Sequence, residues 1–551
     1  MLFRSIHLRL AEYYEKNNLI IEALHHYNFS QNPEKAAQAL NKVIKDVHSR
    51  EMVLKERNWV FDLPTDALKE HPWLLIYKGR ISEYSGDYKK ASNNYQSALE
   101  IMTDISDNYG IMMAHYYIAK ITQLTKVGDS IENLECAKKY AILLKDDFMY
   151  SLILRKIASE NRINGNFDIA MTNLKKAIEI TTSINNEIGL SLCFHTMGNL
   201  YRSMFDFENS IECYDKAIVI RESQGDRYGK AKSLNNKAVA LKELGNFKLA
   251  EQLFNQSFSI KDELNDDFGK CLTLDYMGEM YLSMDNLDQA FTVYNKSLRI
   301  KEAIGGNDIY GVTKNKIFIG EIYNERGEWK KALELLDYAK MVSMDNNMKS
   351  LSATSKLFIA DAKSMIGEYD LSLNIYYEAL NEFKRLSLYN RIVECGVKII
   401  NLLLRQKKYQ EASGLYAEIK SILGEKKSAV KPATLKLKGI SLEILRGNIL
   451  GAEKDLSDFK GANENESTVT AEYFLVKSEY CRSTLAIEDA ISYIKKAINI
   501  FKILRKEFRI FLASERLVKS YIVLDKIDEF RQEYENYSGI AQRFGFKKIS
   551  F

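Results

Sequence analysis

A short phrase that recurs every forty residues is the feature that most constrains the fold of this chain. Each copy has Gly or a polar residue, then Asp, Asn or Glu, an aromatic residue, two variable residues and Ala or Ser. The copies end at Ala91, Ala170, Ser210, Ala250, Ala290, Ala332, Ser372, Ala412, Ala452, Ala490 and Phe530. From Ala170 on, successive copies are 40 residues apart, except for 42 across the loop GGNDIYG and 38 before Ala490. A degenerate unit fits between Ala91 and Ala170, so about twelve units cover roughly residues 71–551, and the length need not mean several domains.

Each unit has the pattern of two helices. Before the turn, Phe194, Met197 and Tyr201 recur at helical spacing, and Ser210 and Tyr214 do so after it. The chain has only 4 prolines and 27 glycines in 551 residues, too few turn formers for a strand-and-turn fold. We therefore predict an all-α fold. The small residue lets the second helix approach the first, large aromatics fill the space between units, and a turn glycine supplies a positive φ.

The segments GNLYRSMFDFENSIECYDKAI and MGEMYLSMDNLDQAFTVYNKSL resemble the tetratricopeptide repeat, in the long form similar to that of kinesin light chain. The resemblance implies a right-handed α-solenoid of about twelve tetratricopeptide helix pairs, ended by an atypical unit at Phe530.

The first residues carry a second resemblance, to the junction in maltose-regulator-type signal-transduction ATPases of the LuxR-related class. It is carried by HLRLAEYYEKNNLIIEALHHY and WVFDLP, and by Ala11, Glu22, Ala23, His25, His26, Ala36, Ala37, Leu63, Pro64, Pro72 and Gly79. In that family a nucleotide-binding domain precedes this segment and a repeat-built sensor follows it. No GxxxxGK[ST] phosphate-binding loop occurs in this sequence. The resemblance therefore implies an ATPase domain either upstream of the chain or on a separate partner.

We expect three regions: a helical lead-in over 1–70, a repeat superhelix with the main concave groove over 71–425, and C-terminal repeats with capping helices over 426–551. The flexible points between repeats are expected at EKKSAVKPATLK and GANENEST.

Charge and motifs disfavour several classes of function. A net charge of +4 gives no support for direct nucleic-acid binding, and no apolar run is long enough to span a membrane. The six cysteines lie far apart, as expected of reduced thiols in a cytoplasmic protein. No catalytic motif or metal-ligand spacing occurs. We predict no enzyme activity, no cofactor and no metal.

The tetratricopeptide resemblance places a ligand groove on the first helix of each pair. The ligand-facing positions that it implies are Arg155, Arg162, His195, Asn199, Arg202, Lys232, Asn235, Asn236, Asp275, Tyr276 and Glu279, followed by Phe318, Glu321 and Asn324. Asn199 and Asn236 occupy positions that hold a ligand backbone in peptide-binding relatives. The groove is basic up to Lys232 and becomes acidic and aromatic from Asp275.

The leading hypothesis is a non-enzymatic recognition module, the sensor and partner-binding region of a maltose-regulator-type transcriptional or signal-transduction regulator. The alternative is a stand-alone scaffold or adaptor for protein–protein interaction. Either reading implies a protein or peptide partner, and the basic end also admits an anionic small effector. Self-association remains open at this stage.

Overall fold

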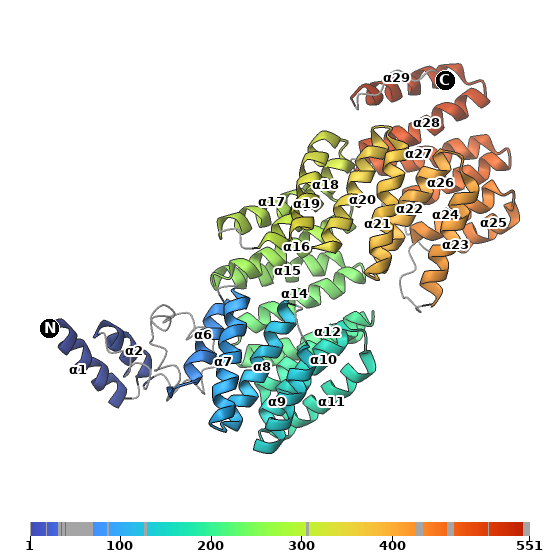
Figure 1. Cartoon of the computed structure of the whole chain (residues 1–551). Helices are drawn as coiled ribbons and strands as arrows, with labels where there is room; N and C mark the ends of the chain where they lie inside the picture. The colour runs from blue at the N-terminus through green and yellow to red at the C-terminus, as the bar shows by residue number, and fades with distance from the viewer. Residues whose placement is uncertain are drawn as a thin grey trace. The chain divides into compact units, whose positions relative to one another are not determined.

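The computed structural model describes residues 2–17, 19–30, 35, 39, 70–84, 87–125, 129–304, 308–425, 433–459, 468–504 and 506–543. Within these residues the regular elements are all α-helices (Figure 1). The lead-in has α1 (Leu2–Lys16) and α2 (Ile20–Phe29), and the first repeats have α6 (Trp73–Tyr84), α7 (Tyr88–Asp104), α8 (Asn108–Thr125), α9 (Ser130–Leu144), α10 (Asp147–Ile163), α11 (Phe167–Ser183), α12 (Glu187–Ser203), α13 (Phe207–Ser223), α14 (Arg227–Glu243) and α15 (Phe247–Glu263).

The repeats continue through the rest of the chain. They contain α16 (Asp267–Ser283), α17 (Leu287–Ala303), α18 (Ile309–Glu325), α19 (Trp329–Asp345), α20 (Lys349–Met365), α21 (Tyr369–Arg385), α22 (Tyr389–Arg405), α23 (Tyr409–Glu425), α24 (Ala433–Leu445), α25 (Ile449–Ser457), α26 (Thr468–Ser483), α27 (Ile487–Ile503), α28 (Glu507–Val523) and α29 (Ile527–Arg543). In the described residues, α6 to α29 make twelve consecutive pairs, so the predicted all-α solenoid of helix pairs is confirmed. We call the even-numbered helices from α6 to α28 the A helices, and the odd-numbered helices from α7 to α29 the B helices.

The chain divides into two compact units, residues 1–253 and 254–551. This division lies within α15, away from the expected boundaries near residues 70 and 425, and those boundaries remain predictions. The two segments expected to be flexible lie largely outside the described residues, which omit 426–432 and 460–467.

Small residues let each B helix pack closely on its A helix. The repeat-phrase residues from Ala91 to Ala490 are all fully buried. The Ser210 hydroxyl donates a hydrogen bond of 2.8 Å to the carbonyl oxygen of Gly198 on the neighbouring A helix. The Tyr214 ring lies against Gly198, where an added Cβ would come within 2.7 Å of the ring. Glycine at this A-helix position therefore makes room for the large aromatic residue of its own pair.

The turns rely less on glycine than the sequence suggested. Among the described residues, six glycines and eleven other residues have a positive φ. Phe205, Asp285 and Leu485 occupy the same turn position as Gly245. In the described residues, several repeats have a second left-handed residue after the B helix, as at Asn265. Left-handed backbone at non-glycine residues is costly, so packing of the adjoining helices must hold these turns.

In the first part of the stack, an Asp or Asn side chain caps the N-terminus of most A helices, directly after the turn from the preceding B helix. Asp226, Asp266 and Asp308 each accept a hydrogen bond from the backbone N–H of the glycine three residues later. Asp266 thus caps the start of α16. Such caps satisfy backbone donors that would otherwise have no partner at a buried helix start.

In the second unit, segments far apart in sequence come into contact. The backbone N–H of Thr468, at the start of α26, donates to Asp285 Oδ2 at 2.9 Å. Lys506, just before α28, places its Nζ 2.6 Å from Asp285 Oδ1 and 3.5 Å from Glu325 Oε2. The last repeats of this unit therefore return to the turn between α16 and α17. We call Asp285, Glu325, Thr468 and Lys506 the closing contact.

Candidate functional site

The predicted groove residues of the first unit lie on three successive A helices. Helix α10 carries Arg155 and Arg162, α12 carries His195, Asn199 and Arg202, and α14 carries Lys232, Asn235 and Asn236. A repeat spacing of forty residues brings side chains from neighbouring A helices together, and several of these residues are hydrogen-bonded to one another.

Asn199 and Asn236 form the centre of this polar surface. Asn199 Oδ1 accepts hydrogen bonds from the Tyr214 hydroxyl at 2.7 Å and from Asn236 Nδ2 at 3.0 Å. Among the described residues, no partner is found for Asn199 Nδ2 or Asn236 Oδ1. The two amides therefore present one donor and one acceptor, the pair of groups that a peptide unit requires.

His195 lies among basic residues. Its Nδ1 is 3.0 Å from the Ser233 hydroxyl and 3.5 Å from Arg221 NH1. Burial, and next Arg221 and Lys232, hold the pKa of His195 well below its ordinary value. The imidazole is therefore neutral at physiological pH, and it serves as a hydrogen-bonding group without adding positive charge.

Arginine side chains give this surface its charge. The Nε atoms of Arg155, Arg162 and Arg202 are buried and have no hydrogen-bond partner. Arg162 donates from NH1 to the Ser203 hydroxyl at 3.0 Å. Burial and the neighbouring Arg202 lower the pKa of Arg162. Clustered guanidinium groups with unused donors favour an acceptor-rich or anionic ligand.

A lysine beside this cluster is also perturbed. Burial, followed by the charges of Arg155 and Lys120, lowers the pKa of Lys156 to about 7. Glu160, with a buried Oε1 that lacks a partner, is the nearest acid on the same helix. The first unit therefore combines excess positive charge with incomplete hydrogen bonding.

Three of the predicted ligand-facing residues are buried, and one of them, Asn324, is 9% exposed. Asn235 is 1% exposed and Asp275 is 5% exposed. Both lie about one turn before the small A-helix residue, and the Asp275 side chain contacts α17, the B helix of its own pair. Lys232 is exposed, with its Nζ 4.3 Å from the centre of the Tyr228 ring.

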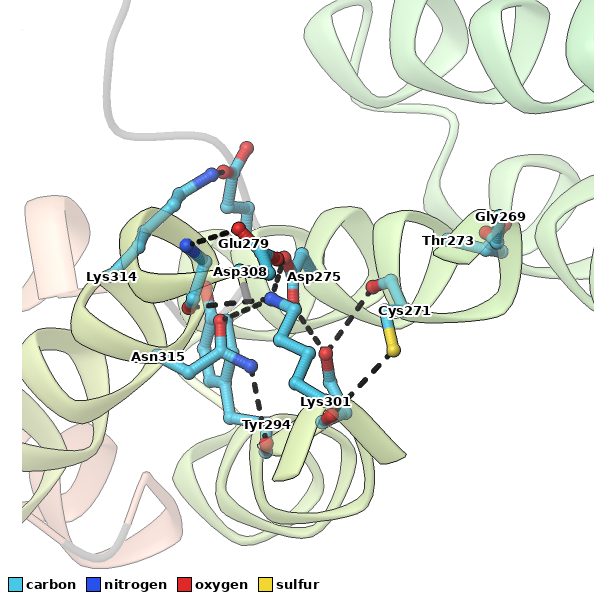
Figure 2. Close-up of polar contacts among 12 residues, drawn as sticks. Gly269, Cys271, Thr273, Asp275, Glu279, Tyr294, Lys301, Asp308, Lys314 and Asn315 are labelled. Atoms are coloured by element: carbon cyan, nitrogen blue, oxygen red, sulfur yellow. Dashed lines mark hydrogen bonds and ion pairs between the residues drawn. The ribbon is translucent and has the colours of Figure 1, made fainter. Parts of the chain in front are cut away.

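In the second unit, Asp275 belongs to a buried ion pair (Figure 2). Its Oδ2 lies 2.7 Å from Lys301 Nζ, and its Oδ1 accepts from the Ser297 hydroxyl at 2.7 Å. Lys301 also donates to Asn315 Oδ1 at 3.2 Å. These contacts join α17 to both α16 and α18, so Asp275 has a structural role in the described contacts.

The other two predicted residues of this stretch remain half-buried. Tyr276 stacks on Phe254, with 6.5 Å between ring centres. Glu279 accepts from Lys314 at 2.9 Å, as Figure 2 also shows. Asp275 is thus paired with a lysine of its own helix pair, and Glu279 with a lysine of the next pair.

The sequence reasoning missed a row of buried cations. Arg221, Lys261 and Lys301 are 3%, 2% and 3% exposed and lie forty residues apart on successive B helices. Basic residues recurring at the repeat period, near the end of each B helix, are a signal that could have revealed the row.

The sequence reasoning also missed a cavity of about 810 Å³ in the second unit. Side chains from A helices α18, α20, α22, α24, α26 and α28 line most of it. Glu321 and Asn324, two of the predicted inner positions, belong to its wall. Apolar side chains form part of the wall as well, namely Met365, Leu402, Leu445, Leu475, Phe501 and Leu512.

One group of charges in the cavity is densely paired. Lys398 pairs with Asp361, and Arg509 donates to Glu472 Oε1 at 3.3 Å. Burial opposes ionisation of Glu325, but Lys506 and Arg509 outweigh it, and the pKa of Glu325 falls to about 2. We call Glu325, Asp361, Lys398, Lys438, Glu472 and Arg509 the paired cluster.

Glu321 differs from these carboxylates. Burial, followed by the charge of Glu394, raises the pKa of Glu321 to about 8. Its carboxyl group is therefore largely protonated at neutral pH, and can donate a hydrogen bond into the cavity.

A second group of charges lies two helical turns further along the same helices. Arg516 donates to Glu479 at 2.6 Å, and Lys519 donates to Glu515 at 2.5 Å. Arg405 and Arg482 also line the cavity, and within the described chain neither guanidinium has a hydrogen bond or an ion pair. Enclosure by protein, together with Arg509 and Arg516, lowers the pKa of Arg405 although its neighbour Tyr369 opposes this. We call these six residues the open basic end.

Comparison with known proteins agrees with this architecture. Residues 187–263 match the model of the tetratricopeptide repeat family. The chain thus carries tetratricopeptide repeats, which typically form non-catalytic scaffolds for protein–protein interaction. A search of curated protein sequences finds no match.

Solved structures resemble the chain at low sequence identity. The Rap protein complexed with Competence and Sporulation Factor is 12% identical, with 64% of this chain and 98% of that chain covered and a TM-score of 0.50. The Cut9–Hcn1 hetero-tetramer of APC/C is 12% identical over 87% of this chain and 89% of that chain, with a TM-score of 0.49. BtubC from P. vanneervenii is 20% identical over 39% of this chain and 88% of that chain, with a TM-score of 0.35. At such identities the Rap likeness establishes the fold alone.

Two searches of the described residues gave negative results. None of the described helices is both long and apolar enough to cross a membrane. Nor do three or more His, Cys, Asp or Glu side chains in that part of the chain come together as a metal site.

Proposed function

We propose that the chain is a non-catalytic recognition module that binds protein or peptide segments on the inner faces of its A helices. The observation that supports it most directly is the set of buried guanidinium Nε atoms without partners on Arg155, Arg162 and Arg202. Leaving a buried donor without a partner is costly, and a ligand carbonyl or carboxylate would remove that cost.

The groove proposed for the first unit comprises Arg155, Arg162, His195, Asn199, Arg202, Lys232 and Asn236. A ligand backbone would accept from Asn199 Nδ2 and donate to Asn236 Oδ1. The arginines would take acidic side chains or an anionic effector. In the second unit, Tyr276 and Glu279 would be ligand-facing residues in their own right.

The role that we favour for this module is the sensor and partner-binding region of a maltose-regulator-type regulator. Ligand binding would change the curvature of the repeat stack and so alter how the N-terminal helices dock on an ATPase. A stand-alone scaffold is the second candidate, and the family match at residues 187–263 supports it equally. The genomic reading frame before Met1 separates them: an in-frame phosphate-binding loop supports the sensor, and an independent ribosome-binding site supports the scaffold.

The binding test replaces Asn199, Arg202 and Asn236 together by Ala and compares the protein partners captured from a lysate of the source cell. A matched control replaces Asn173, Lys175 and Lys176 on the outer helix α11 by Ala. We expect the groove variant to lose its specific partners and the control to keep them, with both retaining the helical circular dichroism spectrum. Equal capture by a folded groove variant would refute the groove assignment.

A further inference from the structure

The two ends of the cavity in the second unit differ in the groups that they leave unpaired. One end has hydrogen-bond acceptors without donors, and the other has cations without a counter-charge. Two polar side chains in its wall that are about nine-tenths buried have an acceptor without a hydrogen-bond partner: Asn324 Oδ1 and Glu472 Oε2. Asn324 donates from Nδ2 to the Phe358 carbonyl oxygen at 2.8 Å, which fixes the amide so that Oδ1 is the unused atom. For Glu472 Oε2, Lys438 Nζ at 3.7 Å is too distant for a hydrogen bond. These two oxygens therefore have no N–H donor within hydrogen-bond distance in the described residues.

The open basic end carries more positive than negative charge. Glu479 and Glu515 are each neutralised by a neighbouring cation, so Arg405 and Arg482 leave two positive charges without a counter-charge. Guanidinium groups bind carboxylates with two parallel hydrogen bonds.

The helices set the distance between the two ends. On each of three helices, a residue of the paired cluster and a residue of the open basic end are seven residues apart. These are Lys398 and Arg405 on α22, Glu472 and Glu479 on α26, and Arg509 and Arg516 on α28. At 1.5 Å per residue, these pairs are about 10 Å apart along the helix axis. An extended peptide advances about 3.3 Å per residue, so about three residues span the same distance.

The wall between the ends is apolar. Leu402, Leu475 and Leu512 lie between the charged positions on the same three helices. The volume of about 810 Å³ is in the usual range for sites that enclose a small ligand. A molecule that fits has a donor at one end, an apolar middle and an anion at the other.

We propose that this cavity binds a short free peptide of about three residues as a zwitterion. Its amino terminus donates to Asn324 Oδ1 and Glu472 Oε2, its side chains contact the leucines, and its terminal carboxylate pairs with Arg405. The inference rests on the proposed recognition function, and it assigns a ligand class and an orientation to a site outside the groove of the first unit.

The test uses native mass spectrometry of the full chain with three mixtures: free tripeptides, the same tripeptides as C-terminal amides, and the same tripeptides acetylated at the amino terminus. We expect one free tripeptide per chain, with binding about ten- to a hundredfold weaker after either modification, because a charged hydrogen bond is lost. Arg405→Met is expected to bind the free mixture as weakly as the wild type binds the amides.

Arg446→Met is the matched control, because Arg446 lies at the end of α24 outside the cavity lining, and it should bind as the wild type does. If Arg405→Met fails to fold by circular dichroism, Arg482→Met tests the same end. The proposal is overturned if the folded wild type binds no free tripeptide at a concentration on the order of 1 mM, or if the amides bind equally well. Binding of nucleoside monophosphates in place of peptides would overturn it as well. Because the groove variant of the first unit leaves this cavity intact, failure of the groove and failure of the cavity are separable.

Discussion

Replacing Gly278 by Ala tests the reason given for glycine in the A helices. A Cβ at this position would lie 2.5 Å from Tyr294 Cζ and 2.7 Å from both neighbouring ring carbons. Tyr294 cannot easily move away, because it is fully buried and stacks on Phe318 with 5.4 Å between ring centres. Forcing a methyl group into such packing costs about 1–3 kcal/mol. The higher helix propensity of alanine offsets about 1 kcal/mol of this cost.

Gly414 supplies the matched control. It lies inside α23, is exposed, and a Cβ there would meet nothing within 4 Å. Gly414→Ala therefore gains the helix preference alone, about 1 kcal/mol of stabilisation. The difference between the two variants isolates the packing cost of about 1–3 kcal/mol.

Hydrogen exchange suits this comparison, because repeat proteins open locally and a global unfolding free energy is poorly defined for them. Each variant changes the hydrogen-exchange protection factor of its own helix pair. The two changes should differ by about 5- to 150-fold. Protection should rise in α23 for Gly414→Ala and fall, or rise less, in α16 and α17 for Gly278→Ala. An equal rise in both variants would refute the claim that the glycine makes room for the tyrosine.

Other predictions concern charge and turn geometry. Lys506→Met removes the cation that pairs with Asp285 and Glu325, so the free energy of opening α26 and α28 should fall by about 3–5 kcal/mol. Unchanged exchange would show that the contact is not stabilising. Glu325, with a folded pKa of about 2 against 4.5, contributes stability that is present above pH 4.5 and lost as the pH falls toward 2, and Glu325→Gln should flatten this decline in acid melts. Lys156 has a pKa of about 7 in the folded chain against 10.5 when unfolded, so the unfolded chain binds more protons and stability should rise with pH between these values. Lys156→Met should remove that rise and raise the melting temperature at pH 7. Leu485→Gly relieves a left-handed turn residue at φ 62° and should stabilise its repeat by roughly 1 kcal/mol, whereas a lower melting temperature would mean that the leucine side chain holds the turn.

The fold was predictable because its determinants are local and repeated. Ala170 and Ser210 mark a small position that must recur wherever a B helix crosses an A helix, and both are fully buried. The left-handed turn residues follow the same forty-residue period, even where Phe205 or Leu485 replaces glycine. The residue type at each left-handed turn position was less predictable, because tertiary packing overrides the conformational preference of the individual residue.

The sites were less predictable because they depend on orientation and on long-range closure. Asn235 and Asp275 were expected in the groove, but a residue one turn before the small position faces the neighbouring helix, and both are buried. The cavity wall shares Glu325 with the closing contact, in which Thr468 bonds to Asp285 across 183 residues. Such closure accumulates from small rotations between successive repeats, and no single repeat encodes it.

The row of buried cations shows how repeats that share one architecture can be joined in a fixed order. Arg221 donates to the Ser233 hydroxyl at 2.6 Å, and Lys261 donates to the Thr273 hydroxyl at 2.7 Å. Each cation lies on a B helix, and each acceptor lies twelve residues later on the next A helix. A buried charge is destabilising without such a partner, so a repeat that follows Arg221 or Lys261 must offer an oxygen at this position. Hydrophobic stripes alone would allow many pairings of neighbouring repeats, and the cations favour those that satisfy them.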